Sequence, residues 1–117
     1  MAVLLFGRMG NDRSVVILLA DDNAADVHLT ITALREARRL PEVHVVSDGE
    51  EALAFLNRVG SYIIAPRPDI VFLDLSLPKV DGYQVLEAMK ADPVLRQIPV
   101  VVISGSRRLE RIEIPSC

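Results

Sequence analysis

The sequence predicts an α/β fold in which the strands of a mostly parallel β-sheet alternate with helices. Four short, nearly continuous apolar runs rich in Val, Ile and Leu lie at residues 15–20, 43–46, 70–73 and 100–103. The three segments between them carry apolar residues at helical spacing. Continuous apolar runs are typical of parallel strands that are covered on both faces. The order β-α-β-α-β-α-β therefore predicts right-handed crossovers and a parallel sheet.

The three helices are predicted from spacing and from the residues at their ends. Their apolar faces are Val27, Ile31 and Leu34; Ala52, Phe55, Leu56 and Val59; and Gly82, Val85, Leu86 and Met89. Asp48 and Gly49 precede the second helix, and Gly60 follows it. Asp81 opens the third helix, next to Gly82. Short polar residues and Gly at these positions are the usual start and stop signals of helices.

One domain is expected from a length of 117 residues. Residues 1–13 are predicted to be an N-terminal extension of little regular character, and residues 14–117 form the domain. Residues 60–69 are predicted to be a loop stiffened by two prolines. The longest apolar runs are short of the roughly 20 residues that a bilayer requires, so no membrane contact and a cytoplasmic location are expected.

The composition excludes several classes of protein. Half of the residues are hydrophobic, which is too many for a disordered chain. A net charge of −3 argues against a nucleic-acid binder, because such proteins present a basic face. Cys117 is the single cysteine, so an intrachain disulfide is impossible and a structural zinc site is not expected.

Short polar residues follow three of the predicted strands. Asp21 and Asp22 follow the first strand, Asp74 ends the third, and Ser104 ends the fourth. Open α/β sheets bind ligands outside the carboxyl ends of their strands. If the strand order is 2-1-3-4, the first and third strands are neighbours, so Asp22 and Asp74 share one pocket and Ser104 flanks Asp74.

Three carboxylates so close together favour a hard cation. Their mutual repulsion raises at least one pKa unless a cation is present, and Mg²⁺ is bound by carboxylates, waters and phosphate oxygens. Carboxylates, a metal and a free hydroxyl suit phosphoryl transfer, with Asp74 as the better candidate nucleophile. Simpler interpretations remain: Asp22 or Asn23 could only cap the first helix, and Ser104 by itself could belong to an ordinary loop.

Three motifs together resemble the receiver domain of response regulators in two-component signalling. They are Val-Val-Ile-Leu-Leu-Ala-Asp-Asp-Asn-Ala-Ala-Asp (15–26), Ile-Val-Phe-Leu-Asp-Leu-Ser-Leu-Pro-Lys-Val-Asp-Gly (70–82) and Ile-Pro-Val-Val-Val-Ile-Ser-Gly-Ser (98–106). The likeness spans residues 14–106. Residues 44–56 and 65–69 resemble most closely the single-domain regulators that partner bacterial phytochrome-type histidine kinases. The resemblance implies a three-layer α/β/α, flavodoxin-like fold.

The resemblance also implies residue roles and partners. Asp74 would accept a phosphoryl group from a sensor histidine kinase and is the phosphoacceptor. Asp21, Asp22, Asp74 and the backbone carbonyl of Ser76 would bind Mg²⁺. The hydroxyl of Ser104 would act as the switch that carries the signal to a downstream protein partner. No enzyme activity beyond weak autophosphorylation and autodephosphorylation is implied, and the sequence leaves a homodimer open.

The C-terminus departs from the family pattern. No Lys follows Lys90 and no aromatic residue follows Tyr83, so the phosphate-pairing lysine and the aromatic switch of the fifth strand are missing. We expect a truncated domain that lacks the fifth strand and the fifth helix, with impaired signalling. The fourth strand would then become an exposed edge, and the inner face of the first helix would lose part of its cover.

Two other functions compete with signalling. The first is a Mg²⁺-dependent phosphohydrolase with an aspartyl nucleophile, although such enzymes need a second Asp where this chain has Ser76. The second is an interaction module that works without phosphorylation. Turnover of a phosphate ester would favour the first, and partner binding unchanged by Asp74→Asn would favour the second.

Overall fold

A single twisted sheet organises the chain in a computed structural model that describes residues 14–36, 40–103 and 109–112. Its strand order is β2-β1-β3-β4-β5. The strands are β1 (Val16–Ala20), β2 (Glu42–Val46), β3 (Ile70–Asp74), β4 (Val100–Ile103) and β5 (Leu109–Ile112). The first four pair in parallel, which confirms the predicted order 2-1-3-4. The predicted extension at residues 1–13 lies outside the described residues.

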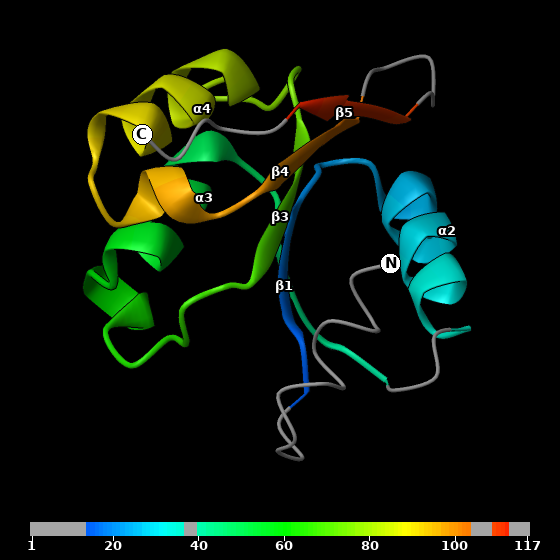
Figure 1. Cartoon of the computed structure of the whole chain (residues 1–117). Helices are drawn as coiled ribbons and strands as arrows, with labels where there is room; N and C mark the ends of the chain where they lie inside the picture. Colours follow the sequence, from blue (N-terminus) through cyan, green and yellow to red (C-terminus); the bar gives the residue numbers. More distant parts are fainter. Residues whose placement is uncertain (1–13, 37–39, 104–108, 113–117) are drawn as a thin grey trace.

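The helices cover the two faces of the sheet unequally. They are α2 (Ala24–Leu34), α3 (Gly49–Asn57) and α4 (Gly82–Ala91), with short 3-10 turns η1 (Gly60–Tyr62) and η2 (Leu95–Gln97). Figure 1 shows α2 on one side of the sheet and α3 and α4 on the other, which confirms the three-layer arrangement. Within the described part of the chain, no helix is long and apolar enough to cross a membrane.

The main core lies between the sheet and the pair α3 and α4. Successive strand residues alternate between the two faces of a sheet, so every second residue contributes to this core. Its strand members are Leu18, Ala20, Val46, Val71, Leu73, Val100 and Val102, and its helix members include Phe55, Leu56, Val85 and Met89. All of them are almost completely buried. Burial of this kind holds the carboxyl ends of β1 and β3 in a fixed relation.

The opposite face is less well covered. No residue of α2 is buried, and Val27, Ile31 and Leu34 are only half-buried. A groove of about 430 Å³ runs between α2 and the sheet. It is lined by Asp26, Leu29, Thr30, Ala33, Leu34, Phe72 and Ile103. The partial cover expected for the first helix is therefore present in the structure.

The expectation that β4 is an exposed edge is wrong. β5 pairs with β4 in the antiparallel direction, with Val100 opposite Ile112 and Ile103 opposite Leu109. Residues 109–112 form this additional strand. Without a neighbour, the edge of β4 would leave backbone N–H and C=O groups free to pair with another strand. An antiparallel partner can follow β4 after only a short connection. The edge of the sheet is thus β5, while no parallel fifth strand occurs among the described residues.

The second helix ends earlier than predicted. Its last residue is Asn57, because Arg58 adopts the left-handed conformation with φ of 58° and closes the helix. Val59, predicted as the last residue of the apolar face, therefore lies past the helix end and is 51% exposed. Gly60 begins η1, so part of the loop predicted at residues 60–69 is a 3-10 turn.

Candidate functional site

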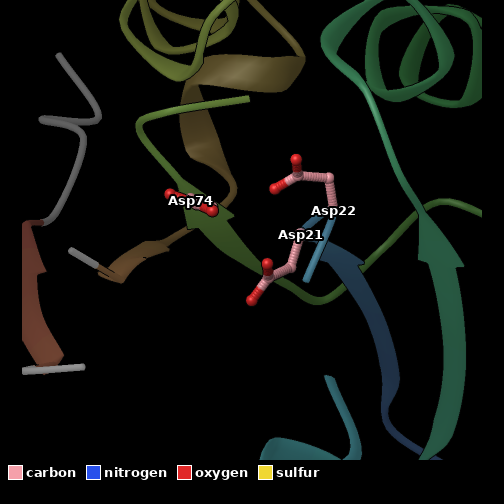
Figure 2. Close-up of side chains that lie close together, drawn as sticks. All are labelled: Asp21, Asp22 and Asp74. Carbon is pink, nitrogen blue, oxygen red and sulfur yellow. The ribbon is translucent and has the colours of Figure 1, made fainter. Parts of the chain in front are cut away.

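The predicted acidic residues come together at the carboxyl ends of β1 and β3. These strands are direct neighbours, with Ala20 opposite Leu73 in the register. Asp21 and Asp22 follow β1, and Asp74 is the last residue of β3. One carboxylate oxygen of each Asp lies within 4.8 Å of the others. Figure 2 shows the three side chains at the ends of the two strands, as the sequence predicts.

Asp21 is the most buried member of this acidic cluster. Only 2% of the residue is exposed. Its Oδ1 accepts a hydrogen bond of 2.9 Å from the backbone N–H of Asn23, whereas its buried Oδ2 has no hydrogen-bond partner in the described structure. Burial, reinforced by the negative charge of Asp74, raises the pKa of Asp21 to about 6 against the lowering effect of the Asn23 N–H. A buried oxygen without a partner requires either a proton or a cation.

Asn23 caps α2, which answers a question that the sequence left open. Its side-chain oxygen accepts a hydrogen bond of 2.9 Å from the N–H of Asp26. The cap therefore makes no use of Asp22, whose residue is exposed beside the other two carboxylates. The simplest interpretation of Asp22, as a helix cap, is wrong, and its carboxylate is available to a ligand.

Asp74 is held in place by the residue two positions further on. The backbone N–H and the hydroxyl of Ser76 both donate to Asp74 Oδ1, each at 2.9 Å. Only 7% of Asp74 is exposed. The sequence predicted a role for the Ser76 carbonyl and missed its hydroxyl. The available indication was the spacing, because Asp side chains commonly bind backbone and side-chain groups two residues later.

Gly82 packs closely against the backbone of Asp74 and Leu75. Its N–H donates to the carbonyl oxygen of Leu75 at 3.1 Å. A Cβ atom on Gly82 would lie 2.5 Å from the carbonyl oxygen of Asp74, which is closer than real Cβ contacts. The loop that leaves the site therefore requires glycine at this position for space, not for an unusual backbone angle.

Ser104 lies outside the described residues, so its switch role stays a prediction. The last described residue of β4, Ile103, is opposite Asp74 in the register.

The donor set fits a hard divalent cation. Carboxylates are ligands that Mg²⁺ and Mn²⁺ prefer, and small hard cations are held by one or two carboxylates with water completing the shell. Asp21 supplies a buried oxygen without a partner, Asp22 an exposed carboxylate and Asp74 a carboxylate fixed by Ser76. The same cation would remove the repulsion between the three charges.

Comparison with known families matches residues 17–113 to the response regulator receiver domain. The chain belongs to this family. Over 91 residues it is 44% identical to response regulator Rcp1 of Synechocystis sp., covering 78% of this chain and 62% of Rcp1. It is 40% identical over 92 residues to the probable methanogenesis regulatory protein FilR2 of Methanothrix harundinacea, covering 78% of this chain and 58% of FilR2. The receiver chain thus spans about three fifths of these curated relatives.

Solved structures agree with this membership. The phosphorylated cyanobacterial phytochrome response regulator RcpA superposes with a TM-score of 0.77 at 47% identity, over 82% of this chain and 69% of RcpA. The Mn²⁺-bound form of Rcp1 gives 0.76 at 42% identity, over 80% of this chain and 68% of that chain. The predicted likeness to phytochrome-type response regulators is confirmed.

Proposed function

We propose that the receiver chain accepts a phosphoryl group on Asp74 and passes a signal through protein contacts. The observation that carries the proposal is the acidic cluster itself, in which Asp21 has a buried unpartnered oxygen and the three carboxylates each bring one oxygen within 4.8 Å of the others. A divalent cation, Mg²⁺ by preference, would be held by Asp21, Asp22, Asp74 and the carbonyl of Ser76. When bound it neutralises the charge of the phosphoryl oxygens.

The chain's own residues prepare Asp74 for the transfer. Ser76 fixes Oδ1 with two hydrogen bonds, which leaves the other carboxylate oxygen as the nucleophile. That oxygen attacks phosphorus and forms a P–O bond, while the P–N bond of the donor phosphohistidine breaks and the leaving imidazole takes up a proton from water. The product is an acyl phosphate on Asp74. Burial of Asp74 limits the access of water to the reacting atoms.

The proposed partner on the input side is a sensor histidine kinase, of the phytochrome type in the narrower form of the proposal. Its support is the similarity to RcpA, a phytochrome response regulator, and to Rcp1. The output is contact with a downstream protein in the cytoplasm, with a homodimer as an alternative assembly. Neither nucleic acid nor membrane is a proposed partner, because the chain is acidic overall.

Incubation with radiolabelled phosphoramidate and Mg²⁺ tests the proposal directly. We expect acid-stable, base-labile label on the wild-type chain and none on Asp74→Asn. Asp92→Asn is the matched control, because Asp92 lies away from the site and an Asn Oδ1 can keep the hydrogen bonds from the N–H groups of Val94 and Leu95. Label that persists on Asp74→Asn would contradict the assignment of Asp74.

The phosphohydrolase alternative has less support from the site. Such enzymes need a general acid two residues after the nucleophile, and Ser76 occupies that position with its hydroxyl donated to Asp74. Continuous release of phosphate from a small phosphate ester, with no stable label on Asp74, would favour the alternative.

A further inference from the structure

The loop between β3 and α4 is held in place by contacts at two points along its length. This loop, residues 75–81, carries Ser76 and therefore the backbone carbonyl proposed as a metal ligand. Near Asp74 it is held by the two Ser76 hydrogen bonds and by the bond from the Gly82 N–H to the Leu75 carbonyl. The middle of the loop, at Pro78 and Val80, lies against the first residue of α3, which comes from a different crossover of the fold.

Contact between the loop and α3 is close. The N–H of Gly49 donates to the carbonyl oxygen of Pro78 at 3.2 Å. A Cβ atom on Gly49 would lie 1.6 Å from the carbonyl oxygen of Val80, so only glycine lets the loop backbone approach the helix this closely. Lys79, between these two loop residues, adopts a left-handed backbone with φ of 69°. A non-glycine residue in that conformation is held there by its surroundings.

An ion pair closes this contact. The Nζ of Lys79 lies 3.5 Å from Oδ2 of Asp48, and the Asp48 side chain is only 10% exposed. Oδ1 of the same carboxylate accepts from the N–H of Glu51 at 2.8 Å and caps α3. The two oxygens of Asp48 therefore have separate tasks: one starts the helix, and the other binds the loop.

We propose that Asp48 and Lys79 are positioning residues for the metal and phosphoryl site, because their ion pair holds the β3–α4 loop, and with it the Ser76 carbonyl, against α3. This inference rests on the proposed function of the Asp74 site. Neither residue is among the carboxylates and Ser76 groups assigned to the site, so both act through the loop. Thermodynamic coupling then requires that metal binding and the loop contact support one another.

The size of the effect is bounded by the ion pair. Lys79 is 60% exposed along its side chain, and exposed pairs contribute little to folding. The loop is either held against α3 or released from it, and a ligand shifts this equilibrium only by the difference between its affinities for the two states. Loss of the ion pair should therefore weaken metal affinity by about three- to fivefold. Thermal stability should change little.

The test uses the full chain with three variants and the metal alone. Mn²⁺ affinity is measured by calorimetry, and hydrogen exchange of the Gly49 amide is followed by NMR in the metal-free chain. We expect Lys79→Met to weaken Mn²⁺ binding about three- to fivefold and to speed Gly49 exchange several-fold. Lys79→Arg should restore both. Lys90→Met, which removes the other lysine of the chain from the exposed end of α4, should change neither.

Asp48→Asn provides the second line of the test. The amide oxygen can keep the cap of α3, so this variant should keep its helix and yet repeat the effects of Lys79→Met. Wild-type Mn²⁺ affinity in Lys79→Met, or equal weakening in Lys79→Met and Lys79→Arg, would overturn the inference. Failure of the proposed function would be seen separately, as the absence of label from phosphoramidate on the wild-type chain. The Mn²⁺ affinities and the Gly49 exchange rates of the variants can still be measured in that case.

Discussion

Ser76 binds Asp74 twice, through its backbone N–H and through its hydroxyl, and both hydrogen bonds end on the same carboxylate oxygen at 2.9 Å. The arrangement fixes the rotation of the Asp74 carboxylate. It also distinguishes the two carboxylate oxygens, because Oδ1 accepts both hydrogen bonds and the other oxygen is left to act as the nucleophile. An acceptor whose oxygens are distinguished in advance loses less conformational freedom when the phosphoryl group arrives.

Ser76→Ala should slow phosphorylation of Asp74 without abolishing it. The substitution removes one of the two donors and keeps the backbone N–H and carbonyl. We expect the free energy of unfolding to fall by about 1 kcal/mol, the usual net value of one hydrogen bond. Urea denaturation and the rate of labelling by phosphoramidate measure the two effects. Ser61→Ala, at an exposed position in η1, is the control and should change neither.

Gly82→Ala should be far more damaging than Gly60→Ala. The new Cβ at position 82 would meet the backbone of Asp74 and Leu75 at 2.5 Å, and overpacking against backbone costs about 3 kcal/mol. At position 60 the same Cβ would meet open space, so only the left-handed φ of 62° resists, at about 1 kcal/mol. Thermal denaturation of the two variants should show this order. Equal melting temperatures would contradict the close approach at Gly82.

Metal affinity should depend on pH through Asp21. Because the pKa of Asp21 is about 6, protons compete with the cation below that pH. Calorimetric titration with Mn²⁺ should show affinity falling as the pH is lowered from 7 to 5. In Asp21→Asn the affinity should be weak at pH 7 and should vary less with pH. An unchanged pH profile in this variant would assign the proton to another group.

Without metal, the same group should make folding more favourable in mild acid. Asp21 has a higher pKa in the folded chain than its ordinary value of 3.8. Its contribution to stability is therefore complete below about pH 4 and is lost as the pH rises through about 6. At pH 7 in a chelator, Asp21→Asn should be more stable than the wild type by about 1–2 kcal/mol. At pH 4 the difference should disappear.

Asn23→Ala should weaken α2 by removing its cap. Loss of an N-cap side chain costs about 1 kcal/mol in the free energy of unfolding. The backbone N–H of residue 23 can still donate to Asp21, so the acidic cluster itself is retained. Asn23→Asp keeps a capping oxygen and should retain most of the stability. Urea denaturation of the two variants side by side provides the comparison.

The parallel part of the fold could be predicted because buried strands are visible as continuous apolar runs. Four such runs predicted the four parallel strands, whereas the order 2-1-3-4 was a condition that the structure then met, and the strand register was not predicted. β5 could not be found in this way. The sequence Leu-Glu-Arg-Ile has no continuous apolar run, and its pairing depends on the open ladder of β4, which is a tertiary partner and not a local preference.

The site was predictable at the level of residue types but not of individual hydrogen bonds. Placement at neighbouring strand ends was enough to bring Asp21, Asp22 and Asp74 together. The choice of cap between Asp22 and Asn23 depended on side-chain geometry, since both types cap helices well. The contact of Gly49 with Val80 was equally impossible to predict, because it joins the first residue of α3 to a loop that is distant in the sequence.

The shallow packing of α2 means that this helix need not unfold together with the rest of the molecule. α3 and α4 share one core with the strands and are expected to unfold together with the sheet, whereas α2, with no buried residue, can detach alone. Its first turn follows directly on Asp21 and Asp22, while Asp74 belongs to the rigid part. Asp21 is buried and its N–H donates to the Val46 carbonyl in β2, so the acidic cluster belongs to the rigid sheet and borders α2 only at Asp22. A cation bound there would use part of its binding free energy to keep α2 docked on the sheet. The fraction of molecules with α2 docked would then depend on whether the site is occupied.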